Sequence, residues 1–291
     1  MSAPGKFHLG LPAWSHAPWR GTLYTRDAAV SDYLPQYAQV FNAIEGNTTF
    51  YGVPKAETVA RWAAESPAHL RFCWKFPKVI THELQLIGAA AATNEFLNRM
   101  APLGEKLGPF FIQLHDRFGP ARLRNLEQYL RALPREFHFA VEVRHPGFFD
   151  GGEDERSLDT LLSELGIDRV NFDTVAVHSS LATDAHTAES KQRKPRLPRR
   201  TTATGPRPFV RFVGDPVIEK NEGALSDWAA IVARWLGAGR EVYFFVHHPN
   251  DDFAPPLARL FQTIAGAQST SVPPPAVWPG ECDGPQQFSL F

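Results

Sequence analysis

The chain has 291 residues, of which 43% are hydrophobic, and its formal net charge is -1. This content is enough for a large core, and one barrel domain commonly takes up to about 250 residues. The near-zero charge excludes a general basic field for nucleic acid, and the only two cysteines, Cys73 and Cys282, exclude a disulfide framework or a paired-cysteine zinc site. The N-terminus lacks a basic-then-apolar leader, and no apolar run reaches the roughly 20 residues that cross a bilayer. We therefore expect a cytoplasmic protein without a membrane partner.

Short runs rich in aromatic and branched residues alternate with helical stretches, which is typical of strand–helix units around a parallel sheet. Eight strands are expected, near Phe7 to Trp14, Val40 to Glu45, Leu70 to Lys75, Phe110 to Leu114, Phe139 to Val143, Val170 to Asp173, Phe209 to Val213 and Val242 to His247. One helical face is formed by Leu225, Trp228, Val232 and Trp235 and ends at Gly237. The pattern predicts an α/β protein, a (β/α)8 TIM barrel over residues 1–267 with a Pro-rich tail over 268–291.

The ends of the expected strands are unusually polar. In a barrel of this kind the active site is built from residues at the carboxyl ends of the strands. The runs end in Trp14, Glu45, Lys75, Gln113, Glu142 with Arg144 and His145, Asp173, Arg211, and His247 with His248. We expect these groups to share one site, although any single one could be a rim ion pair.

Two carboxylates dominate the expected site. Glu45 and Glu142 follow the second and fifth strands, roughly opposite each other, and paired carboxylates divide acid and base roles in glycosidases. The alternative for each is a salt bridge to Lys75 or Arg144. With Arg211, these cations favour a substrate that carries phosphate or carboxylate. Glu45, Glu142, His145 and Asp173 are our candidate catalytic residues, and Lys75, Arg144, Arg211, Gln113 and His247 are expected to bind substrate.

A divalent metal stays open. Oxygen and nitrogen ligands of the kind used in metal-assisted phosphodiester hydrolysis come from Glu45, Glu142, His145, Asp173, His178, His247 and His248. No local spacing requires a metal, and the adjacent His247 and His248 would point to opposite faces of a strand.

Aromatic residues follow the first two strands. Trp14, Trp19 and Tyr51 could stack on a base or a sugar ring, whereas Phe50 is better explained as a lid over the core. Asn47 and Thr49 could orient Glu45 or cap a turn.

A basic loop insertion is expected at about residues 184–206. Its six cations within ten residues are Lys191, Arg193, Lys194, Arg196, Arg199 and Arg200. The loop follows the sixth strand and therefore emerges on the face of the expected site, which favours contact with a polyanion such as DNA over a merely solvated charge run.

The last five residues resemble the peptide by which bacterial replication and repair proteins dock on the DNA sliding clamp. In this pattern Gln287 supplies polar anchoring and Leu290 and Phe291 enter an apolar groove, with Phe288 where Leu is usual. The Pro-rich segment from Gln268 to Gln286 is expected to be a flexible stem. The alternative is a C-terminal latch that packs back on the barrel.

Several motifs together resemble the domain of unknown function 72 family over about residues 7–265. They are Trp14-Ser15 with Trp19-Arg20-Gly21, Glu45 through Tyr51, Phe72 through Pro77 with Thr81-His82, Leu103 through Pro109, and Val141 through Pro146. The resemblance implies a TIM barrel whose activity is not settled. The chain departs from the family at Pro12-Ala13, at Gln113 through Phe118 and at His247-His248, so the details of the substrate site are expected to differ.

Other enzyme classes lack their motifs here. The chain has no phosphate loop, dinucleotide fingerprint or Gly-x-Ser-x-Gly elbow, so we expect no nicotinamide, flavin or nucleotide triphosphate. The sequence favours a hydrolase of a phosphate-bearing, DNA-associated substrate that the clamp recruits. The alternatives are a glycosidase-like hydrolase and a non-catalytic adaptor that binds DNA or protein.

Overall fold

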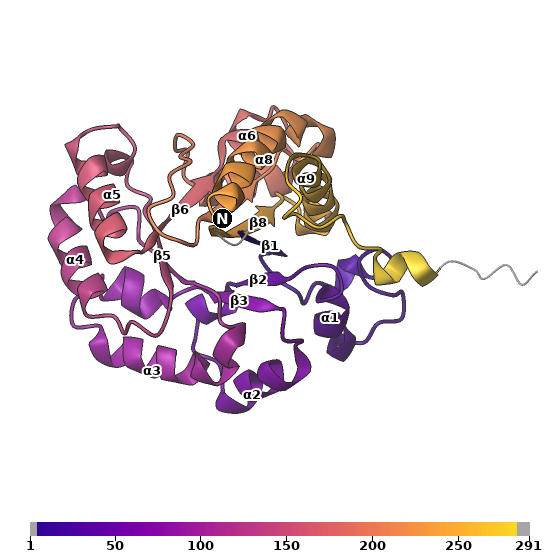
Figure 1. Cartoon of the computed structure of the whole chain (residues 1–291), viewed down its shortest axis with the longest axis horizontal. Coiled ribbons are helices and arrows are strands. Elements are labelled where there is room, and N and C mark those ends of the chain that lie inside the picture. The colour runs from indigo at the N-terminus through magenta and orange to yellow at the C-terminus, as the bar shows by residue number, and fades with distance from the viewer. Residues whose placement is uncertain (1–4, 284–291) are drawn as a thin grey trace, which may run out of the picture.

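The computed structural model describes residues 5–283 and has eight strands inside a ring of helices (Figure 1). The strands, all paired in parallel, are β1 (Lys6–Leu11), β2 (Ala43–Gly46), β3 (Arg71–Trp74), β4 (Phe110–Gln113), β5 (Phe139–Glu142), β6 (Asp168–Asp173), β7 (Phe209–Val213) and β8 (Glu241–His247). Each lies where the sequence predicts a strand, and they follow the order β3-β2-β1-β8-β7-β6-β5-β4. The predicted TIM barrel is confirmed.

The barrel closes between β3 and β4 through isolated bridges and not through a regular ladder. Phe72 pairs with Leu107, and Lys75 pairs with Phe111. The amide of Phe76 also donates to the carbonyl of Phe111 at 3.0 Å. The backbone of Lys75 therefore lies at the seam of a nearly closed barrel.

The covering helices follow the strands around the outside of the barrel (Figure 1). They are α1 (Val30–Tyr37), α2 (Ala56–Glu65), α3 (Ala90–Met100), α4 (Leu123–Arg131), α5 (Glu153–Leu165), α6 (Val175–Ser179), α7 (Ala185–Arg193), α8 (Glu222–Gly237) and α9 (Ala254–Gln268). The expected Leu225 to Trp235 helix is α8. Helix α5 ends at Gly166, whose φ of 64° is the left-handed conformation that glycine adopts most readily. Within residues 5–283, none of the helices combines the length and the apolar character needed to cross a bilayer.

Strand alternation divides the core into two layers. Cys73, Phe111, Phe209, Tyr243 and Phe245 pack together in a cluster of buried residues separate from the larger one. The intervening strand residues join the helices in that larger cluster. Since successive strand residues point to opposite faces, the inward residues of each strand can be followed to its carboxyl end.

The expected flexible stem instead contacts the barrel domain as far as Glu281, which pairs with Arg259. Val272 is 4% exposed and Trp278 is 6% exposed. The guanidinium of Arg259 on α9 lies 3.6 Å from the centre of the Trp278 ring, and Gln262 donates to the carbonyl of Pro273. These contacts hold residues 272–281 against α9 despite their Pro-rich composition.

Candidate active site at the carboxyl ends of the strands

A polar layer tops the apolar interior of the barrel. It continues the inward faces of six strands, because each member stands two residues beyond an inward apolar or small residue. The members are Glu45 after Ala43, Lys75 after Cys73, Gln113 after Phe111, Glu142 after Ala140, Arg211 after Phe209 and His247 after Phe245. All six are at most 9% exposed. The structure therefore brings these six predicted site residues together in one layer.

Arg211 joins the two carboxylates. Its Nε and Nη2 donate to the two oxygens of Glu45 at 2.8 and 2.7 Å, and its Nη1 donates to Glu142 at 2.6 Å. The guanidinium also lies over the rings of Phe111 and Phe172, 5.2 and 4.8 Å from their centres. This fork fixes the geometry of both glutamates.

Three further side chains contact the carboxylates from the sides, and one of them also contacts Gln113. Arg144 donates to Glu142 at 2.7 Å and to Gln113 at 2.8 Å. Asn47 donates to Glu45 at 2.8 Å, and the Nε2 of His247 lies 3.0 Å from the same carboxylate. Asn47 thus orients Glu45, and the alternative of a salt bridge between Glu142 and Arg144 is also realised.

Both carboxylates remain ionised. Burial would raise the pKa of Glu45, but Arg211 and His247 hold it well below its usual range. Burial opposes ionisation of Glu142 as well, and Arg211 and Arg144 lower its pKa. A general acid needs a carboxyl that stays protonated near neutral pH, so this geometry does not suit either residue for that role.

Lys75 differs from the other cations of the polar layer. Its Nζ lies 3.9 Å from the centre of the Phe50 ring. This Nζ forms no ion pair or hydrogen bond with the described residues. Burial, together with the charges of Arg211 and Arg144, lowers the pKa of Lys75 to about 7. A large fraction of this amine is therefore neutral at physiological pH.

His82 lies beside Phe50, and sequence analysis named it only as part of a family motif and not as a site residue. It lies on a π-helical turn, Val79–Glu83, and its ring centre is 5.0 Å from that of Phe50 and 5.2 Å from that of His115. Burial, then the charges of His115 and Lys75, lower its pKa to about 4. Leu86, just beyond this turn, has a φ of 70°, and such backbone strain and π turns are frequent near functional sites. The signal in the sequence that could have identified His82 was its position in the segment that follows β3.

Two of the candidate catalytic residues lie outside the polar layer. Asp173 points away from the barrel interior and accepts from Trp228 and from Arg199, both at 2.8 Å. It does so because Phe172, its predecessor, takes the inward position. The ring of His145 accepts from the amide of Gly147 at 3.1 Å and so caps a turn.

The other histidines divide as strand alternation requires. His247 points inward, whereas His248 lies 2.7 Å from the carbonyl of Asn250. His178 contacts the carbonyl of Lys194. Across residues 5–283, no group of three or more His, Cys, Asp and Glu side chains is arranged to hold a metal ion.

The tryptophans expected at the site support the fold instead. Trp14 packs edge-on against Trp62 and Trp74, because β1 ends at Leu11, before Pro12, and the chain has already turned outward. Trp19 is 1% exposed and donates to the carbonyl of Asp251. Tyr51 is 78% exposed, and Thr49 bonds the carbonyl of Lys75.

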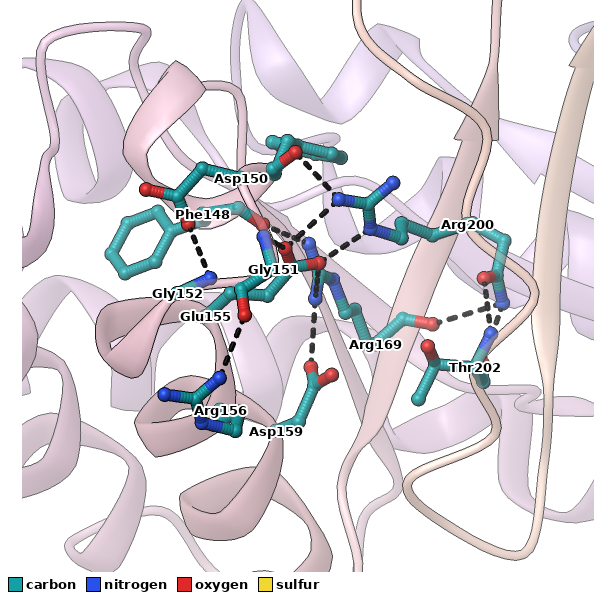
Figure 2. A network of polar contacts seen from close by, with 12 residues as sticks. Phe148, Asp150, Gly151, Gly152, Glu155, Arg156, Asp159, Arg169, Arg200 and Thr202 are labelled. Carbon is teal, nitrogen blue, oxygen red and sulfur yellow. Dashed lines mark hydrogen bonds and ion pairs between the residues drawn. The ribbon is translucent and has the colours of Figure 1, made fainter.

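The basic loop is largely tied to the barrel. Arg200 donates to both oxygens of Glu155, and the buried Arg169 of β6 donates to Glu155 and to Asp159 (Figure 2). Burial raises the pKa of Glu155, but its bonds from Arg200 and Gly151 and the charge of Arg169 bring it down to about 2. This ionised network anchors the end of the loop.

The remaining loop cations have different surroundings. Arg199 pairs with Asp173 and Asp227. Lys191 donates to the carbonyl of Ser180, Lys194 donates to Ser190, and Arg193 pairs with Glu189 on the surface. Arg196 is exposed. Only Arg193 and Arg196 thus present exposed side chains to a polyanion.

Two of the larger cavities lie at the opposite end of the barrel. One of about 500 Å³ contains His138, Asp168 and Arg207, and another of about 570 Å³ contains Lys6 and Arg207. These residues precede or begin strands. We assign the site to the carboxyl ends because known barrel enzymes work there and because the polar layer lies there. The clamp-like residues Gln287, Phe288, Leu290 and Phe291 lie outside the described residues.

Comparisons with known proteins agree with the fold. Residues 8–280 match the family described as "Protein of unknown function DUF72". The chain is 36% identical over 285 residues to the UPF0759 protein YecE of Escherichia coli K12. The alignment covers 98% of this chain and 99% of that protein. A crystal structure of a DUF72 family protein from Thermotoga maritima has a TM-score of 0.68 at 20% identity, covering 90% of this chain and 99% of that one. One from Enterococcus faecalis has a TM-score of 0.64 at 23% identity, covering 90% and 98%.

Proposed function

The chain belongs to the DUF72 family, whose function is unknown, and we propose from its own polar layer that it is an enzyme acting on a small anionic substrate. The substrate carries a phosphate or carboxylate group and binds at the carboxyl ends of the strands. Arg144 and Lys75 are the cations that bind its anionic group, since Arg211 already pairs with two carboxylates.

One observation carries this proposal: when Lys75 is protonated, the cations at the carboxyl ends of the strands outnumber the two carboxylates. Glu45 and Glu142 face Arg211, Arg144 and Lys75. Buried charges are ordinarily paired. An anionic ligand would supply the missing partner, and the side chain of Arg144, which is 16% exposed, is accessible to it.

The ion-paired glutamates weigh against the glycosidase-like hydrolysis that the sequence analysis kept as an alternative, and against a metal-binding role for the same residues. A glycosidase needs one protonated carboxyl as its acid, whereas the pKa of each glutamate is lowered. If Glu45 and Glu142 bound a metal ion, this would compete with the hydrogen bonds that both carboxylates accept from Arg211. We therefore keep the anionic substrate and assign no hydrolytic step to Glu45 and Glu142.

Anion binding is tested by titrating the full-length protein with inorganic phosphate and with citrate while its unfolding is followed. A ligand at 100 times its Kd should stabilise the fold by about 2.7 kcal/mol. Arg144→Gln should remove most of this gain. Arg207→Gln is the matched control, because Arg207 is also ion-paired and partly exposed, with its side chain at 25% exposure, but lies at the other end of the barrel. Equal stabilisation of both variants would contradict the proposal.

Recruitment to the sliding clamp is a second proposal. It is supported by the sequence from Gln287 to Phe291, which follows a packed segment whose last described residues include the exposed Cys282. Calorimetric titration of a purified bacterial sliding clamp would compare the full chain with one ending at Pro285. Binding that disappears on truncation supports recruitment, whereas no binding by the full chain refutes it.

Contact with DNA through the basic loop rests on Arg193 and Arg196. Replacing both with Gln should weaken the binding of duplex DNA and reduce its dependence on salt. The adaptor alternative predicts the same loss, but it also predicts that Arg144→Gln changes nothing. The phosphate titration therefore separates the enzyme from the adaptor.

A further inference from the structure

Lys75 has an amine that the fold does not use. The side chain is buried to 9% exposure at the end of β3, yet its Nζ contacts only the face of Phe50 among the polar and aromatic partners within residues 5–283. In the same layer Arg211 pairs with two carboxylates and Arg144 pairs with Glu142. A cation needed only for packing or charge balance would be expected to share in these contacts.

Other half-buried lysines of the chain are satisfied. Lys106 donates to the carbonyls of Ala63 and Ser66, each at 2.5 Å. Lys191 donates to the carbonyl of Ser180 at 2.7 Å, and Lys194 to the hydroxyl of Ser190 at 2.9 Å. The free Nζ of Lys75 is thus a property of its site and not of lysines in this fold.

The surroundings of Lys75 favour a neutral amine. Burial removes the water that would solvate an ammonium ion, and the nearby guanidinium groups of Arg211 and Arg144 repel it, so the pKa of Lys75 falls to about 7. Desolvation and neighbouring cations are the two means by which enzymes turn lysine into a nucleophile toward carbonyl carbon.

We propose that Lys75 forms an imine with the carbonyl group of a substrate that also carries a carboxylate or phosphate, a step that rests on the anion-binding function proposed above. The lone pair of Nζ adds to the carbonyl carbon, and a proton moves from nitrogen to oxygen to give a carbinolamine. Loss of the hydroxyl group with one proton releases water and leaves the carbon–nitrogen double bond. Nothing is oxidised or reduced.

The carboxylates limit the cost of a positive charge on this product. When its nitrogen takes up a proton, Glu142 and Glu45 offset the charge in part, as they already oppose the fall in the pKa of Lys75 that burial and Arg211 cause. The ring face of Phe50 below Nζ favours a cation there as well. Arg144 is left to bind the anionic group of the substrate, which explains why one site holds both a free amine and a partly exposed guanidinium.

Trapping with a reductant tests the proposal. The full-length protein is incubated at pH 7 with pyruvate, as the carboxylate probe, or with dihydroxyacetone phosphate, as the phosphate probe, and with sodium cyanoborohydride. At pH 7 a lysine with a pKa of about 7 has about a thousandfold larger neutral fraction than one at about 10.4. We expect one adduct per chain by intact mass, mapped to Lys75 and formed at least tenfold faster than any adduct on Lys78. The probe that reacts identifies the anionic group.

Lys78 is a built-in comparison because it is close in sequence, and its side chain is 54% exposed and paired with Glu83. Lys75→Met should abolish the rapid adduct, and Lys78→Arg should preserve it. The peptide map of the unmodified sequence decides the question even if Lys75→Met fails to fold. Adducts distributed equally over Lys75 and Lys78, or absent from Lys75 with both probes, overturn the imine.

Failure of the two proposals can be told apart. Stabilisation by phosphate that needs Arg144, without an adduct at Lys75, keeps the anion site and refutes the imine. A rapid adduct at Lys75 that Arg144→Gln leaves unchanged, with no stabilisation by phosphate or citrate, refutes the anion-binding role.

Discussion

Removal of the guanidinium that joins the two glutamates should destabilise the barrel strongly. In Arg211→Met three hydrogen bonds disappear, and Glu45 and Glu142, both fully buried, lose their shared partner. Breaking a buried ion pair by removing one partner costs about 3–5 kcal/mol. With a urea m-value of about 3 kcal/mol/M, the midpoint should fall by about 1–2 M at pH 7.

The penalty should shrink as the pH falls. In the parent protein the pKa of each glutamate is lowered on folding, so its stabilising contribution is present above the unfolded pKa of about 4.3 and is lost below it. In Arg211→Met burial should raise both pKa values above the unfolded value. The variant then regains stability relative to the parent between pH 7 and about pH 4.5.

Urea unfolding at several pH values checks this reasoning. Arg131→Met is the control, because Arg131 forms a surface pair with Glu127 and is 50% exposed, so its change should stay within about 0.5 kcal/mol. A loss below about 1 kcal/mol for Arg211→Met at pH 7, or a loss independent of pH, would refute a buried, ionised pair of glutamates.

Three further predictions concern residues near the site and in the C-terminal segment. A Cβ at Gly46 would lie 2.0 Å from the ring of Trp74, whereas one at Gly52 would meet nothing within 4 Å; Gly46→Ala should therefore cost about 1–3 kcal/mol or more by urea unfolding, and equal midpoints for Gly46→Ala and Gly52→Ala would contradict the close approach. Asp173→Asn weakens the pairing with Arg199 outside the barrel, so the unfolding midpoint should fall while phosphate stabilisation is preserved; loss of that stabilisation would return Asp173 to the binding site. Trp278→Ala should cost about 3 kcal/mol, because the ring is 6% exposed; an unchanged midpoint for this variant would mean that the segment around Trp278 is not packed in solution.

The sequence was sufficient for the barrel because each strand carries a compact apolar run between helical stretches. It also predicted all six members of the polar layer, since Glu45, Lys75, Gln113, Glu142, Arg211 and His247 each continue an inward face by strand alternation. The clamp-like tail and the contact with DNA stay predictions.

Asp173 shows where that reasoning fails. Strand β6 carries polar residues on its outward face, Arg169 and Asn171, so a polar strand end does not tell which face it occupies. The expected position of Trp14 at the site was wrong for a related reason. Trp14 lies beyond the end of β1, where strand alternation no longer holds.

The pairing of Arg211 with both glutamates could not be read from the sequence, although the pair of Glu142 with Arg144 was among the alternatives. Arg211 is separated by 166 residues from Glu45 and by 69 from Glu142, and nothing local indicates that one guanidinium serves both. Within residues 5–283 the Nζ of Lys75 has no ion-pair partner because the two glutamates pair with arginines, and this follows only from these distant contacts. The most informative property of the site is therefore a result of tertiary geometry.

The same separation has a consequence for how the molecule assembles. A contact between the second and seventh strands can form only when the chain has nearly completed its circuit, so the loop-closure entropy must already have been overcome. The bonds of Arg211 should be absent from the folding transition state and should act chiefly as a brake on unfolding. The amine of Lys75 owes its low basicity in part to that guanidinium, and a half-made barrel would hold an ordinary lysine. Chemical reactivity in this protein should thus appear last, after the structure has closed.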